Sequence, residues 1–480
     1  SQGRPSSASW EEAMTTRGWL VALTIGAAFL AGCSLAPDYL RPDMPVTDSF
    51  KEDGIWRLAQ PADQHNRGEW WPVFQDTLLN QMEVQLEKDS FELVAALARY
   101  DAANAYLSEQ SSRLYPEINA IGGSNTNRES ANRPLRGPNF PNVYGDTTLG
   151  AGFTYEIDLW GDIRNAISSA GALAEASKAD VESIRLSLQA QLATTYFRLR
   201  GLDSEIKLLS DSIKAYQSEL DLMQHRHDEG IVSGLDVARS LALLEQTKAQ
   251  QMSVLGRRAL YEHAIAALLG QSASSFSIPT AELIAVYPSI PSTLPSQVLQ
   301  RRPDIAAAER RVAAANAEIG VARAAFFPTI SLGALGGFQN MGAGALLTAP
   351  NSFWTLGPLA FFNIFDAGLR EAAVQSATAK TAESTALYRI TVLKAFREVE
   401  DNLALLHYLG EENRHQTLAV GAARRTYNLA MNRYREGAVS YLEVIDAENI
   451  KLRTEQVELS IETDRMLASV GLIRAIGGAW

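Results

Sequence analysis

The sequence lacks most of the features that mark a catalytic, metal-binding or nucleic-acid-binding protein. Its 480 residues include one cysteine, so an internal disulfide and a zinc-binding cysteine spacing are both excluded. No glycine-rich phosphate loop followed by Lys and Ser or Thr is present. His225 and His227 lie two residues apart, about 200° around a helix, so they cannot share a metal. We therefore predict no enzyme, no catalytic residue and no metal site.

Positive charge is also scarce, since 43 Lys and Arg stand against 55 Asp and Glu, a formal net charge of −12. Nucleic acid needs a basic surface for its phosphates, so this charge argues against it as a partner. The acidity fits either a pore that favours cations or a generally solvated acidic surface.

The apolar run near the N-terminus is too short to cross a membrane. It follows Arg17 and spans residues 19–31, 13 residues, whereas a helix needs about 20 to cross a bilayer. This pattern is typical of a signal-peptide core, with Met14 as a candidate native start. The run ends in residues 30–33 (LAGC), which look like a bacterial lipobox, so Cys33 is expected to carry a diacylglycerol and an N-acyl lipid as its only attached group. Ser34 resembles the residue of lipoproteins sorted to the outer membrane; an ordinary secretory signal with an incidental cysteine is the alternative.

What the chain does contain is an internal repeat at an offset of about 207 residues. Residues 225–237 return as residues 431–444, with a matching acid after each serine. The matched pairs are Arg226 and Arg433, Gly230 and Gly437, and Ser233 and Ser440. Tyr115-Pro116 and Phe327-Pro328 each open a strand-like run upstream. Each half is therefore predicted to form two strands, a very long helix, a glycine turn and a returning helix.

The predicted strands alternate with a period of two. Residues 148–157 place Leu149, Ala151, Phe153, Tyr155 and Ile157 on one face, and residues 329–338 repeat the alternation. Residues 353–362 form another strand candidate, with aromatics suited to a membrane interface. About ten residues is the length of a tilted membrane strand, although a soluble sheet with one buried face gives the same pattern. Residues 130–146 are predicted to form a solvent-exposed loop.

The predicted helices are too long for a globular domain. Proline is absent between Gly161 and Pro279, and helices are expected from about 161 to 228 and from 366 to about 435, each roughly 100 Å long. Apolar residues follow the three-four spacing of a coiled-coil seam. They are Leu199, Leu202, Ile206, Leu209, Ile213, Tyr216, Leu220 and Met223 in the first helix, and Val392, Phe396, Val399, Leu403 and Leu406 in the second. A cytoskeletal coiled coil would not carry a lipobox and lipid-facing strands.

Six motifs resemble the TolC-like outer membrane factors, and within them the OprM-like efflux lipoproteins. They are residues 37–42 (PDYLRP), 70–74 (WWPVF), 155–161 (YEIDLWG), 294–305 (LPSQVLQRRPDI), 313–320 (AAANAEIG) and 325–328 (AFFP). The resemblance runs from Cys33 to about Ile476. It implies a mixed α and β membrane protein: a homotrimer with a 12-stranded β-barrel, four strands per chain, continued by an α-helical coiled-coil barrel. It also implies a passive exit duct in the outer membrane that works with a periplasmic adaptor and an inner-membrane resistance-nodulation-division transporter.

The resemblance also implies a gate at the two glycine turns, 230–235 and 437–442. By position, Asp236, Tyr434, Glu443 and Asp446 match the family's tip residues. Glu443 and Asp446 are three residues apart and share a helix face, so six carboxylates would converge in a trimer and favour cations. The solvated end of a hairpin is the alternative reading of these acids.

Val439 departs from the family, because some relatives carry a latching arginine there. Arg435, Arg433 or a hydrophobic plug would have to replace it. The small residues of both turns are expected to contact the adaptor: Gly230, Ile231, Val232, Gly437, Ala438 and Val439. The glycines are also required by a tight turn with positive φ.

The predicted segments follow the repeat. They are upstream residues with the signal peptide (1–32), a lipid-anchored segment (33–78), the first repeat (79–270), an equatorial linker (271–296), the second repeat (297–470) and a tail (471–480). Residues 301–304 (RRPD) are interpreted as a structural helix start. The favoured cargo is drugs or other small molecules; metal-ion efflux and protein secretion are alternatives, and eight methionines without a lumen cluster do not favour metal.

Overall fold

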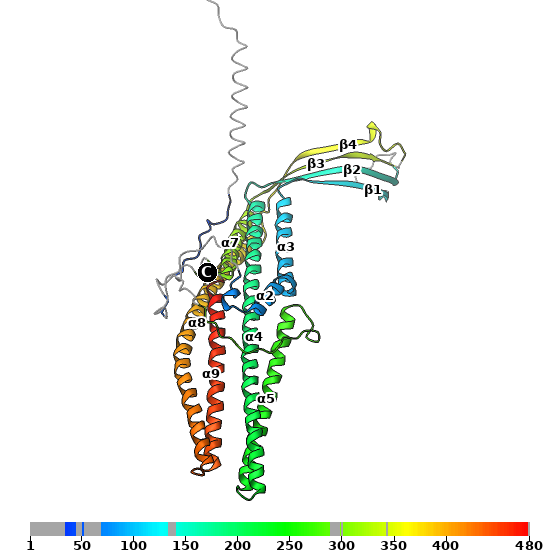
Figure 1. Ribbon diagram of the computed structural model, residues 1–480. Helices are drawn as coiled ribbons and strands as arrows, with labels where there is room; N and C mark the ends of the chain where they lie inside the picture. Colours follow the sequence, from blue (N-terminus) through cyan, green and yellow to red (C-terminus); the bar gives the residue numbers. More distant parts are fainter. Residues whose placement is uncertain are drawn as a thin grey trace, which may run out of the picture. The chain divides into compact units, whose positions relative to one another are not determined.

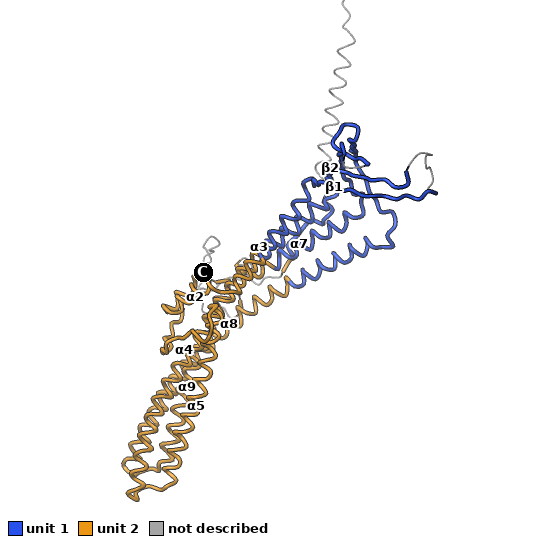
Figure 2. The backbone as a smooth tube through the Cα atoms, turned by 90° about the vertical axis from the view of Figure 1, so that its right-hand side faces the viewer, with its two compact units in different colours: residues 1–42, 100–177, 308–387 blue, residues 43–99, 178–307, 388–480 orange. Residues whose placement is uncertain are grey.

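The computed structural model describes residues 34–44, 50–51, 69–132, 141–288, 298, 301–341 and 344–478. The signal peptide and Cys33 lie outside these residues, as do most of residues 294–300 and part of the loop expected at 130–146. Figure 2 colours two compact units, which each collect three stretches of the chain. Unit 1 comprises residues 1–42, 100–177 and 308–387, and unit 2 comprises residues 43–99, 178–307 and 388–480.

The elements follow one order in both halves of the chain (Figure 1). A 3-10 turn η1 (Trp71–Phe74) and helix α2 (Thr77–Asp89) precede α3 (Phe91–Ser112), β1 (Glu117–Arg128), β2 (Val143–Ile157), α4 (Asp162–Asp228) and α5 (Gly234–Leu268). The second half runs α7 (Pro303–Ala324), β3 (Thr329–Asn340), η2 (Ala349–Asn351), β4 (Ser352–Phe361), α8 (Leu369–Arg435) and α9 (Tyr441–Ala475). Helices α4 and α8 have 67 residues each, and α5 and α9 have 35 each.

A mixed α and β fold with four strands per chain is thereby confirmed, and the expected long helices are present. Two boundaries were wrong. Strand β2 begins at Val143, inside the loop expected at 130–146, and α8 begins at Leu369, three residues after the expected Asp366. The Asp366 carboxylate accepts the backbone N–H groups of Gly368 and Arg370, and Ala367 and Gly368 both have positive φ. Asp366 therefore lies before α8, in the connection from β4, and its carboxylate caps the first turn of that helix.

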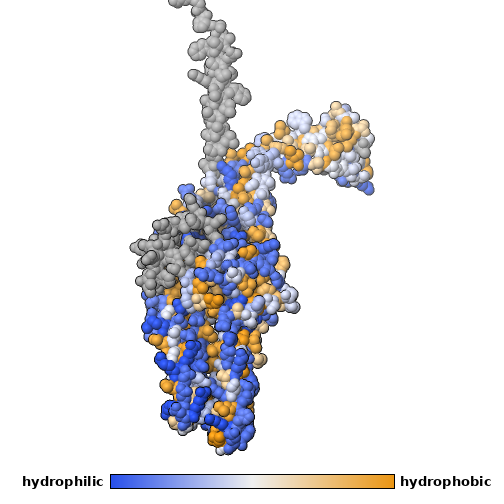
Figure 3. Space-filling model, in the orientation of Figure 1, coloured by the Kyte–Doolittle hydropathy of each residue, from blue (hydrophilic) through white to orange (hydrophobic). Residues whose placement is uncertain are grey.

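The strands of unit 1 form one antiparallel sheet in the order β1-β2-β3-β4. The register pairs Leu149 of β2 with Phe338 of β3, and Gly336 of β3 with Trp354 of β4. Neither face of this sheet is buried within the chain: Gly152 is the one fully buried strand residue among those described. Large apolar side chains are exposed on it, Trp354 by 80%, and Figure 3 shows hydrophobic residues gathered on its visible face. A soluble sheet would bury one face, so this exposure favours the lipid-facing interpretation.

The strand-to-helix junction of the first half is fixed by the YEIDLWG motif. Asp158 accepts the N–H groups of Ile163 and Arg164, and its carboxylate pairs with the Arg164 guanidinium at 3.0 Å. Trp160 stacks on Phe327 at 4.6 Å between ring centroids and donates its indole N–H to the carbonyl of Pro328. The YEIDLWG motif of the first half therefore packs against and hydrogen-bonds to the AFFP motif of the second half.

Two buried arginines connect the helices of unit 2 to its loops. Arg302 is 7% exposed; it pairs with Asp304 and Glu398 at 2.7 and 2.8 Å and donates to the carbonyl of Ala475. Arg200 pairs with Asp203 at 2.9 Å and donates to the carbonyl of Pro279. Pro303 opens α7, which confirms the structural interpretation of residues 301–304. Across the described ranges, no helix combines the length and apolarity needed to cross a membrane.

Candidate functional site at the hairpin tips

Helices α4 and α5 form a first hairpin, and α8 and α9 form a second, each with its tip in unit 2 (Figure 1). Both tips use the same glycine turn. Gly230 and Gly437 each have φ of 75°, a conformation that only glycine adopts without strain. The N–H of Ile231 reaches the carbonyl of Arg226, and the N–H of Ala438 reaches that of Arg433, both at 2.8 Å. These bonds close a Schellman motif at each helix end, so both glycines are required by geometry.

The first tip is held by bonds within its own hairpin. His227 Nδ1 lies 3.0 Å from the carbonyl of Val232, and the Ser233 hydroxyl donates to Asp236 at 2.9 Å. The Asp236 carboxylate also faces the Arg239 guanidinium at 3.8 Å. Asp236, a predicted gate residue, therefore makes its hydrogen bond and its ion pair within the first hairpin.

The second tip reaches across to the first hairpin. The Tyr434 hydroxyl accepts a bond from Arg226 at 3.3 Å and contacts the Met223 sulfur at 3.3 Å. The Arg226 guanidinium lies 5.5 Å from the centre of the Tyr434 ring, a cation-π distance. Tyr434 also packs against Tyr441 with ring centroids 5.3 Å apart. Tyr434, which was predicted as a gate residue, therefore connects the second hairpin to the first near the tips.

The two predicted gate acids of the second tip are exposed. Glu443 faces Arg433 at 4.0 Å with both side chains more than half exposed, and Asp446 lies one turn further along α9. Such a pair contributes little to stability. Within the chain, Arg433 thus approaches Glu443, whereas the cross-hairpin arginine is Arg226, which sequence reasoning did not select.

The predicted adaptor-contacting residues lie at the surface of the two turns. Gly230, Ile231, Gly437 and Ala438 are exposed, Ile231 by 64%, whereas Val232 and Val439 are half-buried. A side chain added at either glycine would meet open space. Both turns therefore present small residues to the outside of the chain.

A polar cluster above the tips was missed by sequence reasoning. Tyr427 and Tyr441 both donate to Glu219 of α4, at 3.0 and 3.4 Å to its two oxygens, and Glu448 of α9 lies beside Glu219. The signal was the seven-residue spacing of Tyr427, Tyr434 and Tyr441, since the matching positions of the first half hold Leu220, His227 and Gly234.

One hydrophobic cluster packs the four helices together around these contacts. Its buried members are Tyr216, Met223, Leu243, Leu244, Tyr441, Val444 and Ile445, from α4, α5 and α9; Tyr427, Ala430, Met431 and Tyr434 of α8 pack against it. The predicted seam residues Tyr216 and Met223 are thereby placed in the core. The two hairpins therefore share one buried apolar core near their tips.

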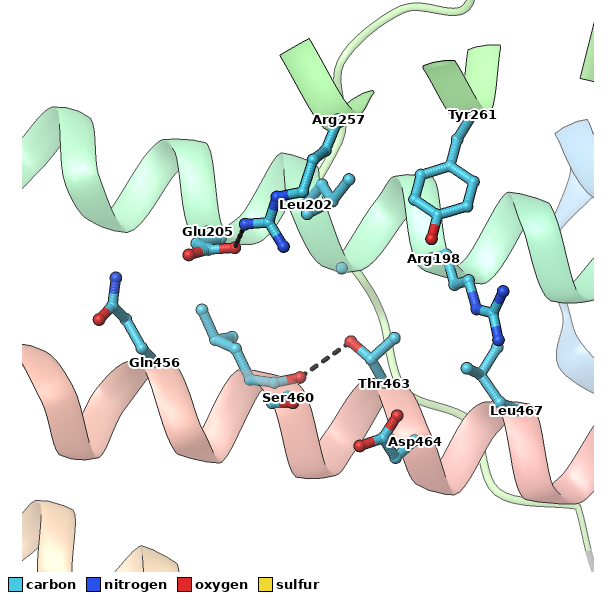
Figure 4. A pocket seen from close by; sticks show the side chains of 12 residues that line it. Arg198, Leu202, Glu205, Arg257, Tyr261, Gln456, Ser460, Thr463, Asp464 and Leu467 are labelled. Carbon is cyan, nitrogen blue, oxygen red and sulfur yellow. Dashed lines mark hydrogen bonds and ion pairs between the residues drawn. The ribbon is translucent and has the colours of Figure 1, made fainter. Parts of the chain in front are cut away.

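A cavity of about 350 Å³ lies between the first hairpin and α9 (Figure 4). Arg198 and Glu205 of α4, Arg257 of α5 and Asp464 of α9 face it, and Arg257 pairs with Glu205 at 3.2 Å. Its basic and acidic groups balance, and none of the predicted gate or adaptor residues lines it. Helices α4 and α9 approach closely at its wall, because a Cβ on Gly201 would clash with the Thr463 hydroxyl.

Comparison with known proteins places the chain in a family. Residues 84–271 and 294–478 match the model of the outer membrane efflux proteins. The chain is 31% identical over 463 residues to the probable efflux pump outer membrane protein TtgC of Pseudomonas putida, covering 96% of both. It is 29% identical over 464 residues to the cation efflux system protein CusC of Escherichia coli, covering 95% of this chain and 97% of CusC.

The fold is shared with solved structures. A membrane protein from Pseudomonas aeruginosa superposes with a TM-score of 0.86 at 29% identity, over 93% of this chain and 98% of that one. The residues that match the family model include both hairpins and all four described strands. The chain therefore belongs to the outer membrane efflux protein family.

Proposed function

We propose that the chain is the outer-membrane exit duct of a tripartite efflux pump and passively conducts drugs or other small molecules. The observation that carries the proposal is the combination of an apolar, uncovered four-stranded sheet with two 67-residue helices that end in matching glycine turns. No bond chemistry is assigned to it. Energy and substrate choice belong to an inner-membrane transporter, which a periplasmic adaptor joins to the duct.

The duct is proposed to be a homotrimer. Among the described residues β1 pairs with β2 alone and β4 with β3 alone, so both sheet edges offer unpaired backbone groups. Such groups are costly in lipid, which admits sheets only as closed barrels. Three copies would give twelve strands, an even number within the range of bacterial barrels. The two halves of each chain would then give six hairpins, the helical barrel of the periplasmic part.

The N-terminal segment is proposed to anchor this trimer through lipid on Cys33. The next described residues lie against unit 1: the Ser34 hydroxyl donates to Asn165 at 2.8 Å, and Tyr39 donates to Glu309 at 2.6 Å. A segment so attached would hold the lipidated cysteine next to the strand-bearing unit. Mass spectrometry of the mature protein tests this, since an unmodified Cys33 would remove the anchor.

The periplasmic gate is proposed to lie at the two tips, where Asp236, Tyr434, Glu443 and Asp446 are found. The exposed turns 230–232 and 437–439 would receive the adaptor. Support comes from the Arg226 and Tyr434 contact, which joins the hairpins within one chain and must change if they separate.

The experiment that tests the duct and its gate is planar-bilayer recording of the purified protein. We expect Glu443→Ala combined with Asp446→Ala to reduce cation preference and alter single-channel conductance, because six carboxylates would be lost from the trimer. Asp401→Ala is the matched control, since Asp401 is an exposed acid on α8 far from the tip. Unchanged conductance and selectivity in the double variant would remove these acids from the gate, and absence of any channel would remove the duct.

Cation efflux is a second candidate, favoured by the similarity to CusC. The described ranges hold no group of three or more His, Cys, Asp or Glu side chains that could hold a metal ion. A deletion strain separates the candidates. Sensitivity to antibiotics, dyes and detergents supports the first, and sensitivity to copper or silver salts alone supports the second.

A further inference from the structure

Glu448 is a buried carboxyl group that lies close to a second acid, Glu219, and to the Lys451 ammonium. It lies on α9 within the core shared by the hairpins and is 2% exposed. Its Oε2 atom is buried and receives no hydrogen bond from the described residues. An isolated buried carboxylate is strongly disfavoured, so this group must carry a proton or acquire one from its environment.

The neighbour of Glu448 is a second carboxyl group, Glu219 of α4. Two phenols donate to Glu219, Tyr427 of α8 to Oε1 and Tyr441 of α9 to Oε2. Glu219 is therefore an acceptor at both oxygens. Two carboxyl groups can bond only through a shared proton, so the proton that Glu448 carries supplies the donor for Glu219.

The electrostatics agree with this geometry. Burial raises the pKa of Glu448 most strongly. The charge and the hydrogen bond of Glu219 raise it further, to about 9. The Lys451 ammonium opposes the shift weakly, because it lies over the Tyr427 ring at 4.7 Å. Glu448 therefore keeps its proton across the neutral range.

The other charged or titratable groups around the pair are Tyr216 of α4, Arg424 of α8, which pairs with Glu455 of α9 at 2.6 Å, and Asp211 of α4, which pairs with Lys207 and Lys214. None of these groups forms an ion pair with Glu448. A cavity of about 220 Å³, lined in part by Tyr216, Lys451 and Glu455, lies against Glu448.

We propose that Glu219 and Glu448 form a proton-binding site that fastens the second hairpin to the first, so that loss of the shared proton loosens both tips. This inference rests on the gate proposed above and adds a ligand, the proton, to it. With the proton in place, Glu219 is held by α8 through Tyr427 and by α9 through Tyr441 and Glu448. Without it, two adjacent carboxylates repel each other in a dry core.

The direction of the pH effect follows from linkage. The packed state binds the proton more tightly than a state in which water reaches both acids. Its advantage is complete below the ordinary pKa of a glutamate and falls as pH rises towards about 9. Raising the pH therefore favours separated hairpins, by up to about tenfold in the opening equilibrium per pH unit within this window.

The test is bilayer recording of the full-length trimer from about pH 6 to about pH 10, a range that spans the expected titration. The wild-type open probability is expected to rise at least about tenfold across it. Glu448→Gln keeps the shape and supplies a permanent donor, so it should stay at the low-pH level throughout. Glu219→Gln removes the repelling charge, so the transition should move to lower pH. Glu245→Gln changes an exposed acid on α5 and should behave as wild type.

A second measurement does not depend on conduction. Infrared difference spectra of the wild type should show a protonated carboxyl band that titrates above neutrality and is missing from Glu448→Gln. If channels form but neither the band nor the pH response depends on Glu448, the proton site is wrong and the duct stands. If no variant conducts, the duct fails, and the band alone decides the proton site.

Discussion

The two hairpin tips have the same backbone and different side-chain bonding. Both end in a Schellman turn at a glycine with φ of 75°, and both restart after a serine with extended backbone. The first tip bonds to itself, through His227 with Val232 and Ser233 with Asp236. The second tip bonds to its neighbour, through Tyr434 with Met223 and Arg226.

This difference shows which positions of the repeated unit have diverged. The backbone of a tip is fixed by the glycine, so it tolerates no divergence. Side chains outside the turn are free to differ, and the three tyrosines Tyr427, Tyr434 and Tyr441 occur in the second half alone. All three tyrosines contact α4, so the second half supplies the side chains that bond the two hairpins together.

The largest effect is expected from removing all three hydroxyl groups, in Tyr427→Phe combined with Tyr434→Phe and Tyr441→Phe. Hydrogen bonds to a charged acceptor contribute about 1.5–3 kcal/mol each, and two of these bonds reach a carboxylate. We expect the open state to gain at least about a hundredfold, measured as open probability in bilayers. Tyr408→Phe, at an exposed position of α8, is the control. A triple variant as closed as the wild type would show that the hairpins are held elsewhere.

The second effect tests what the tips share. Gly230→Ala and Gly437→Ala should each destabilise the protein by about 1–2 kcal/mol, because a β-carbon is strained at this φ. The two costs should agree, since the turns are equivalent. Thermal unfolding measures them. Gly421→Ala, inside α8 with open space around it, should instead be neutral or stabilising by up to about 1 kcal/mol. Unequal costs at the two turns would contradict their equivalence.

The third effect uses the matched arginines of the repeat. Arg226→Ala removes a hydrogen bond and a cation-π contact with Tyr434, which together contribute about 1–2 kcal/mol. Arg433→Ala removes an exposed pair with Glu443 and should cost less than about 0.5 kcal/mol. Open probability should rise in the first variant alone. The reverse order would assign the latch to Arg433.

The smallest effect concerns the serines before the returning helices. Ser233→Ala loses a bond to Asp236 and should cost about 0.5–1.5 kcal/mol in thermal unfolding. Neither serine caps its helix through the side chain, and among the described residues the Ser440 hydroxyl makes no bond like that of Ser233 to Asp236, so Ser440→Ala should cost less. Equal costs would mean that the two serines act through backbone conformation and not through the hydroxyl.

Much of the fold was predictable because local patterns determine it. The period of two marked the strands, and the absence of proline marked the helix that runs from Asp162 to Asp228. The start of α8 was misplaced because Asp366 has an ordinary helical sequence around it, and its role as an outside cap depends on the positive φ of Ala367 and Gly368.

The site was predictable only in part. Tyr434 and the exposed acids followed from the family resemblance, whereas Glu448 did not. Asp446 and Glu448 are two residues apart on α9, about 200° around the helix, and one is exposed while the other is buried. Which face of α9 is buried depends on how α4, α5 and α8 pack around it. The sequence of α9 alone does not determine that packing.

The exposed sheet of unit 1 bears on how the protein folds and assembles. Neither its faces nor its two edge strands are satisfied by the chain that makes it. In the proposed trimer, the free energy of forming this sheet would depend on the concentration of chains and on the surrounding lipid, as in an obligate oligomer. A newly made chain would then complete its fold only when it meets other copies.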